Sequence, residues 1–334
     1  MDQKQNSTTH HMSDENQHWV PKFLIRYFAD KDGRVFCLDT YTDAVTKPPP
    51  KLAACENGFN DFLIDGEAVS FEDKLEKIET PAAPLIKRMI EGRTLACLTP
   101  KDRQRIAEFM AAQSFRTKAF YEGMAGKPDR QKFGRIFGQL WESIFITSGE
   151  IARRHWALMV IASDEVFYLG DNPVVFQWTQ KPGAGGSLGF DVEGVEAFLP
   201  LSPKCALYMP CRATSAQILE GYESALELHR AARTAALRGQ PSGSRELQVA
   251  QNAIRSAHEL YTAFTTGSAV EAITPHVQNL NSLQCLFSHS ALYSSRLDFS
   301  FARHVFQKTP NYRNLQKTSL IQMNVLVPEP QAKP

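Results

Sequence analysis

The spacing of apolar residues predicts a helix followed by a strand near the start of the chain. Between residues 20 and 28, apolar side chains recur every three or four positions, which is the spacing of one helix face. Pro21 suits the first turn of such a helix, where its missing N–H costs nothing. After a turn at 30–33, the stretch 34–39 alternates between apolar and other side chains, as a strand does.

Three longer helices are predicted in the first half of the chain, over 70–92, 99–124 and 129–150. Ser70 can cap the first of them, and Pro81 and Pro84 are expected to kink or break it. Thr99 and Pro100 form a strong start signal for the second helix.

The pattern then changes to a period of two, which predicts a group of strands. These lie at 155–162, 165–170, 195–202 and 204–211, and residues 172–178 either extend the second strand or open another. The glycine-rich composition of 181–189 predicts a flexible loop. It is not expected to bind phosphate, because it lacks the residue order of a phosphate-binding loop and does not open a helix.

Helices return in the last third of the chain. Alanine-rich helices are predicted over 212–239 and 244–266, followed by one from Thr274 through Leu292. Because helices and strands do not alternate, we expect an α+β fold, mostly helical with a small, mainly antiparallel central sheet.

One domain is expected, over 17–310. Residues 1–16 are polar and are expected to be a disordered tail, and residues 311–334 an irregular C-terminal tail. The start has no apolar stretch typical of a secretory signal, and no apolar run is long enough to span a membrane. We therefore expect a cytoplasmic protein that does not enter a membrane.

Composition agrees with a globular domain. Hydrophobic residues make up 43% of the chain and charged residues 22%, with a formal net charge of +1. This balance gives no overall attraction to nucleic acid or membrane surfaces. The six cysteines form no C-x-x-C pair and no zinc-site spacing, so buried reduced thiols are expected.

His18 and Arg26 are the first candidate site residues. A histidine at a helix N-terminus tends to be neutral, so His18 could act as a base or bind a metal, or it could simply anchor the start of the fold. Arg26 lies eight residues later and flanks the same side only loosely. It needs a carboxylate if buried, and otherwise belongs to the solvated side of the helix.

Two further helices carry candidate polar groups. Glu79 shares a helix face with Glu72 and Glu76, which could hold a divalent cation or form a solvated surface. Gln113 and Arg116 are three residues apart, so they could grip one anionic group together or form a surface pair.

Asp171, Asn172 and Pro173 follow directly after strand-like residues. Turn chemistry alone accounts for this trio, because Asp and Asn bond their own backbone and Pro173 forces Asn172 out of the helical region. A carboxylate at a strand end is also how catalytic and metal-binding acids are often presented.

The stretch from His18 to Asp39 resembles the opening of a bacterial family known as domain-of-unknown-function family 4238. That family typically begins His-x-Val-Pro-x-Phe-x-Leu-Arg-x-Phe and continues into a short strand. Later segments resemble it in the same order, at 75–86, 111–117, 170–175, 198–209 and 280–295. Gly170 departs from the family pattern, which more often has serine before Asp-Asn-Pro. The resemblance implies a shared polar set: His18, Pro21, Arg26, Glu79, Gln113, Arg116, Asp171, Asn172 and Asn281.

Two functions remain open from the sequence. The first is a metal-assisted hydrolase acting on a phosphodiester or a nucleotide-like anion, in which Glu79 and Asp171 hold Mg²⁺ or Mn²⁺ beside His18 and Asn172. Arg26, Gln113, Arg116 and Asn281 would then bind the substrate, an anionic small molecule or nucleic acid. The second is a non-catalytic binding or regulatory module in which the same residues form a structural network. No serine-hydrolase elbow, zinc-peptidase motif or dinucleotide-binding glycine pattern is present.

Overall fold

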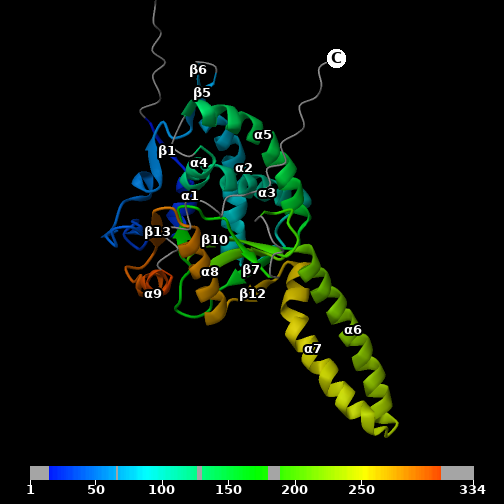
Figure 1. The fold of residues 1–334 in the computed structure, drawn as a ribbon. Coiled ribbons are helices and arrows are strands. Elements are labelled where there is room, and N and C mark those ends of the chain that lie inside the picture. The colour runs from blue at the N-terminus through cyan, green and yellow to red at the C-terminus, as the bar shows by residue number, and fades with distance from the viewer. Residues whose placement is uncertain (1–14, 65–66, 126–129, 180–188, 310–334) are drawn as a thin grey trace, which may run out of the picture.

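The computed structural model describes residues 15–64, 67–125, 130–179 and 189–309. Figure 1 shows a body of helices and small sheets, from which one long helical hairpin extends. The expected α+β class is confirmed: helices predominate, and the strands form small, mainly antiparallel sheets. The expected glycine-rich loop at 181–189 lies almost wholly outside the described residues, as do residues 1–14 and the expected C-terminal tail.

The N-terminal part is a series of short elements that wrap one side of the body. They are β1 (Asn16–His18), α1 (Lys22–Tyr27), β2 (Phe36–Asp39), β3 (Val45–Thr46), a 3-10 turn (Pro50–Leu52), β4 (Cys55–Asn57), β5 (Asp61–Ile64) and β6 (Glu67–Ser70). Strand β1 pairs antiparallel with β4, which places His18 opposite Cys55. Asn16 therefore belongs to a strand, although the polar tail was expected to include it.

Four helices form the upper layer of the body in Figure 1. They are α2 (Glu72–Gly92), α3 (Pro100–Phe115), α4 (Lys118–Ala125) and α5 (Arg130–Arg153). The capping signal at Thr99 is confirmed, because its side chain accepts from the Asp102 N–H while the Asp102 carboxylate accepts from the Thr99 N–H.

A five-stranded sheet lies beneath these helices, in the order β12-β7-β11-β10-β9. Its members are β7 (Ala157–Val160), β9 (Val175–Trp178), β10 (Val195–Ser202), β11 (Cys205–Met209) and β12 (Ala269–Glu271). All neighbours are antiparallel except β12, which runs parallel to β7.

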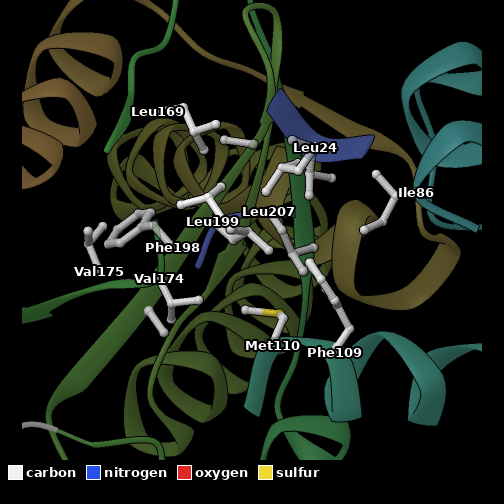
Figure 2. Packing of buried hydrophobic residues seen from close by; sticks show 14 of the residues in the cluster. Leu24, Ile86, Phe109, Met110, Leu169, Val174, Val175, Phe198, Leu199 and Leu207 are labelled. Atoms are coloured by element: carbon white, nitrogen blue, oxygen red, sulfur yellow. The ribbon is translucent and has the colours of Figure 1, made fainter. Parts of the chain in front are cut away.

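The core fills the space between the helical layer and one face of this sheet. Side chains alternate between the two faces of a strand, so Leu199 of β10 and its partner Leu207 of β11 point to the same side. Figure 2 shows them near Leu24, Phe109 and Met110, and all five are at most 1% exposed. The opposite face carries Phe198 and Tyr208, which are also paired.

The second sheet has four strands in the order β3-β2-β13-β8. It contains β13 (Ala291–Ser294) and β8 (Leu169–Gly170), and α8 (Thr274–Phe287) and α9 (Ser300–Lys308) complete this part of the body. The projecting hairpin consists of α6 (Arg212–Leu237) and α7 (Pro241–Thr266). Its two helices are joined near the body by stacked Tyr222 and Tyr261 rings, 4.1 Å apart.

Two helices in the first half of the chain differ from the predictions. Helix α2 is not broken at Pro81 or Pro84, because its buried apolar side holds it in place despite two missing N–H groups. The helix expected over 99–124 divides at Arg116, since the Thr117 hydroxyl accepts from Phe120 N–H and starts α4.

Several boundaries also differ from the predictions. Pro21 precedes α1 as its N-cap instead of occupying its first turn. Phe71 occupies the N-cap position of α2, while the Ser70 hydroxyl one position earlier accepts from the Glu72 N–H at 3.3 Å. The helix expected to reach Leu292 ends at Phe287, because the following backbone N–H groups turn toward Asp171. Helix α9 was not predicted. None of the described helices combines the length and apolar character needed to cross a bilayer.

Candidate functional site

Four of the residues singled out from the sequence lie together around the buried guanidinium of Arg116. Arg116 caps the end of α3 with a side chain only 3% exposed, and its Nη1 forms an ion pair with Glu79 of α2, which is 24% exposed. Its Nε donates to Oε1 of Gln113 at 3.1 Å. Gln113 in turn donates from Nε2 to the Trp19 carbonyl at 2.8 Å. We call His18, Glu79, Gln113 and Arg116 the Arg116 cluster.

His18 joins this cluster in its neutral form. Burial lowers its pKa from 6.5 to about 4, outweighing the hydrogen bond of the ring to the Pro50 carbonyl, and the charges of Lys22 and Arg116 lower it further. Its Nε2 is buried without a hydrogen-bond partner, so Nδ1–H makes the bond to Pro50. Nε2 therefore carries a free lone pair.

The Arg116 cluster continues into a second set of polar side chains around Asn60. The Asn60 side chain donates from Nδ2 to Glu72 at 2.6 Å, and its Oδ1 accepts from the Tyr121 hydroxyl at 3.3 Å. Burial raises the pKa of Glu72, and the hydrogen bond from Asn60 and the charge of Arg116 oppose that shift. Gln17 bonds both Asn60 N–H and Asp61, which fastens β1 to this set.

Asp171 lies in a different place and is fully engaged there. Its Oδ1 accepts from His289 N–H at 2.6 Å, and its Oδ2 accepts from the N–H groups of Ser290 and Ala291 at 2.8 and 3.0 Å. The Ser290 hydroxyl is a fourth donor at 2.9 Å. Burial raises the pKa of the Asp171 carboxyl, while the His289 charge and the hydrogen bonds from 289 and 290 oppose that shift. We call these contacts the Asp171 clamp.

Two amides of α8 support the same region. Asn281 accepts from Tyr168 N–H at 2.8 Å and donates to the Val166 carbonyl at 2.9 Å. Gln284 accepts from Gly170 N–H at 2.7 Å and donates to the Pro173 carbonyl at 3.0 Å. Both amides therefore satisfy the backbone of the segment that presents Asp171.

Tyr293 lies near Asp171 and near Cys55, the strand partner of His18. It is buried on β13, and burial together with Cys37, Asp171 and Cys55 raises its pKa well above the usual value, against a hydrogen bond that the hydroxyl oxygen accepts from the Ala54 backbone. No hydrogen bond or ion pair joins His18 or Glu79 to Asp171 in the described part of the chain. Within the same residues, no group of three or more His, Cys, Asp or Glu is arranged to hold a metal ion.

The remaining two candidates lie apart from these contacts. Arg26 is exposed in the last turn of α1, which corresponds to the solvated alternative considered for it. Asn172 is half-buried beside Asp171. Among the described residues neither side chain makes a hydrogen bond with the Arg116 cluster.

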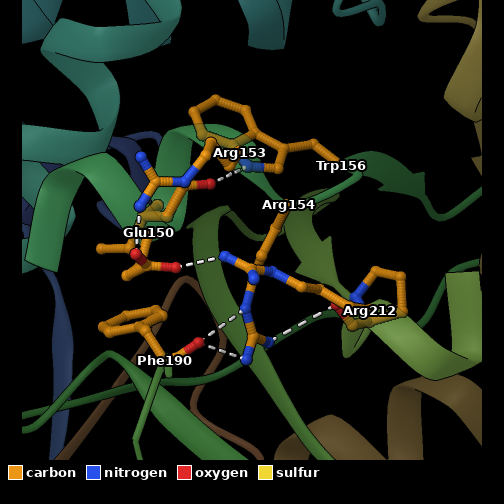
Figure 3. Close-up of polar contacts among 8 residues, drawn as sticks. Glu150, Arg153, Arg154, Trp156, Phe190 and Arg212 are labelled. Carbon is orange, nitrogen blue, oxygen red and sulfur yellow. Dashed lines mark hydrogen bonds and ion pairs between the residues drawn. The ribbon is translucent and has the colours of Figure 1, made fainter. Parts of the chain in front are cut away.

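A buried arginine that the sequence analysis did not select binds the backbone where the inner strands β10 and β11 meet, at one end of the five-stranded sheet. Arg154 is 4% exposed, and Figure 3 shows its guanidinium bound to the Phe190 carbonyl. Its Nη1 donates to the Val195 carbonyl at 2.7 Å. Beside it, Glu150 pairs with the exposed Arg153 and Arg212. The sequence Arg153-Arg154 gives no signal for which of the two is buried.

A cavity of about 400 Å³ opens on the sheet face that is turned away from the core, between the sheet, α7 and α8. Its lining residues are Met159, Gln177, Glu196, Phe198, Tyr208, Glu259, Leu260, Val270, His276 and Asn279. The sequence analysis named none of them, because they come from seven elements and form no local motif. We call this cavity the sheet pocket.

Sequence comparison covers most of the chain, including both polar clusters. A family model described as "Protein of unknown function (DUF4238)" matches residues 16–139 and 139–298. Searches of curated proteins and of solved structures found no match. The chain therefore belongs to the family that its opening motif resembles, domain-of-unknown-function family 4238.

Proposed function

We propose that this protein is a small-molecule binding module, and that the sheet pocket is its ligand site. The observation that carries the proposal is the pocket itself: about 400 Å³ of open space, lined half by apolar or aromatic side chains and half by polar ones. Ligand sites of proteins have this size and combine apolar surface with converging polar groups. The edges of the pocket are built from two helices and a sheet, which can hold its shape before a ligand arrives.

The contacts of the motif residues support a structural role for them. All four donors of the Asp171 clamp point at one carboxylate, so that carboxylate has little capacity left to bind a metal or activate water. Glu79 is likewise paired with Arg116. The motif residues would then hold the body together, while the sheet pocket binds the ligand.

The test compares ligand-induced thermal shifts in two variants. Leu260→Trp narrows the sheet pocket, whereas Leu237→Trp changes a residue that is 81% exposed at the end of the hairpin. Wild type, L260W and L237W would be heated with amines, carboxylic acids, nucleotides and neutral aromatic compounds. We expect at least one compound to raise the Tm of wild type and L237W but not of L260W. A compound that raises the Tm of all three equally would place the ligand site elsewhere and refute the proposal.

A hydrolase acting on a phosphodiester or nucleotide is the second candidate, and one observation favours it. The buried Nε2 of His18 has a free lone pair at neutral pH, which is one requirement of a general base, and the positive charge of Arg116 is close enough to act on the ring. Its test is turnover of phosphodiester and nucleotide substrates with and without Mg²⁺ or Mn²⁺. Loss of that turnover in His18→Asn, with the fold retained, would support the hydrolase.

A further inference from the structure

The charged groups of the sheet pocket share one sign. Glu196 and Glu259 both line it, and none of its lining residues is a lysine or arginine. Glu196 is only 8% exposed on β10, whereas Glu259 lies at the exposed side on α7. A ligand entering the pocket therefore meets the carboxylate of Glu259 at the rim first, and then the buried carboxylate of Glu196.

One oxygen of the buried carboxylate is left for a ligand. The Tyr208 hydroxyl donates to Oε1 of Glu196 at 2.7 Å, and Oε2 makes no hydrogen bond to the described chain. Arg154 lies near enough for its charge to act on Glu196, but its guanidinium is occupied by backbone carbonyls. Burial raises the pKa of Glu196, because the nearby hydrogen bond and charge do not fully offset the loss of water. A cationic ligand bound to Glu196 would compensate the carboxylate for this loss of water.

Next to this carboxylate lie an aromatic pair and an amide pair. The rings of Phe198 and Tyr208 are stacked with centroids 5.0 Å apart. Gln177, which is paired with Glu196 across β9 and β10, accepts from Asn279 at 2.8 Å. Aromatic faces attract cations as well as apolar groups. Met159, Leu260 and Val270 add apolar surface to the same pocket.

We propose that the sheet pocket binds a small organic cation, an ammonium group attached to an apolar body, with the ammonium on Glu196 and the apolar body on Phe198, Tyr208 and Leu260. This inference rests on the proposed binding function and specifies its ligand. It differs from the anionic ligand expected from the sequence, because the arginines that suggested an anion lie elsewhere.

The test uses three probes of similar shape: 2-phenylethylamine, 2-phenylethanol and 3-phenylpropanoate. Binding to the wild-type protein would be measured by calorimetry and by the rise in Tm. We expect the amine to bind and the alcohol and the carboxylate to bind at least about tenfold more weakly, which corresponds to about 1.4 kcal/mol. Glu196→Gln keeps an acceptor for Tyr208 and should weaken amine binding roughly tenfold or more.

A second variant is needed in case Glu196→Gln, at a buried position, disturbs the fold. Glu259→Gln changes an exposed residue and should also weaken amine binding, while Glu246→Gln on the same helix, outside the pocket, should not. Equal binding of the three probes, or binding only of the carboxylate, would overturn the cation inference. The proposed binding function would still hold if L260W abolishes the rise in Tm that the bound probe causes. Absence of amine binding would also overturn it. Failure of every compound in the wider panel would reject the binding module itself.

Discussion

Asp171 and Ala291 are joined by two hydrogen bonds that run in opposite directions. The N–H of Asp171 donates to the Ala291 carbonyl at 3.0 Å, and the N–H of Ala291 donates to Oδ2 of Asp171, also at 3.0 Å. The first bond extends the pairing of β8 with β13, and the second uses a side chain to continue it. The Asp171 clamp therefore fastens the start of β13 to the end of β8.

Replacing this carboxylate should cost stability. In Asp171→Asn, an amide NH₂ replaces one carboxylate oxygen and faces backbone N–H donors that the wild-type oxygen accepts from. This loss should lower the free energy of unfolding by roughly 2–4 kcal/mol. Urea unfolding measures the loss. Asp164→Asn is the matched control, because Asp164 is exposed, and it should change stability by no more than about 0.5 kcal/mol. A D171N protein as stable as wild type would show that the clamp does not stabilise the fold.

The ion pair between Glu79 and Arg116 allows a second stability test. Glu79→Gln leaves a buried guanidinium without its carboxylate and should cost roughly 2–4 kcal/mol in urea unfolding. Glu76→Gln, on the exposed side of the same helix, should cost no more than about 0.5 kcal/mol. If both variants lose the same small amount, the Arg116 cluster contributes little to the fold.

The sequence predicted the elements whose signals are local. The cap at Thr99 and Pro100 could be predicted from neighbouring residues, since capping depends on atoms three positions apart. The end of α8 could not, because the groups that stop the helix are hydrogen bonds to Asp171, more than a hundred positions away in the chain. The continuity of α2 through its prolines likewise depends on packing against other elements.

The candidate site could be predicted only in part for the same reason. His18, Glu79, Gln113 and Arg116 do lie together, and the family resemblance names them among nine polar-set residues without separating them from the rest. Spacing along the chain did not reveal that Asp171 belongs to a separate cluster. No sequence pattern indicated the sheet pocket. Glu196 and Phe198 have the pattern of ordinary strand residues, and only the folded positions of α7 and α8 make them line a cavity.

Stability should depend on pH through His18. Its pKa is about 4 in the folded protein and 6.5 in an unfolded chain, so between these values the unfolded state binds more protons. The free energy of unfolding should therefore fall as the pH drops from 6.5 toward 4, by roughly 1–2 kcal/mol after solvent screening of this half-buried ring. His18→Asn keeps a donor for Pro50 but cannot titrate. Urea unfolding across this pH range should show a shallower slope for H18N, and parallel slopes would contradict the assignment.

Gly170 is required by the position of Gln284. A Cβ at residue 170 would lie 2.9 Å from Oε1 of Gln284 and 3.3 Å from its carbonyl oxygen. Gln284 cannot move freely because its amide holds both Gly170 and Pro173. Gly170→Ala should therefore lower the free energy of unfolding by about 1–3 kcal/mol.

The control for this substitution is a second Gly→Ala change that should raise the stability of the protein instead of lowering it. Gly221 lies inside α6 with open space around it, so Gly221→Ala should raise stability by about 0.5–1 kcal/mol through helix propensity. Thermal unfolding of the two variants side by side distinguishes crowding from a general effect of removing glycine. If both variants gain stability, Gln284 does not restrict residue 170.

Lysine should not be able to replace Arg154 without a loss of stability, whereas it should be able to replace the neighbouring Arg153. The planar guanidinium of Arg154 reaches the carbonyls of Phe190 and Val195 at once, which a lysine ammonium at the end of a flexible stem cannot reproduce. Arg154→Lys should leave backbone carbonyls unpaired and lower the free energy of unfolding by roughly 2–4 kcal/mol. Arg153→Lys alters an exposed ion pair with Glu150 and should cost at most about 1 kcal/mol. Urea unfolding of R154K and R153K compares two arginines that differ in burial. Equal losses would mean that the carbonyl contacts of Arg154 do not determine the stability of this end of the sheet.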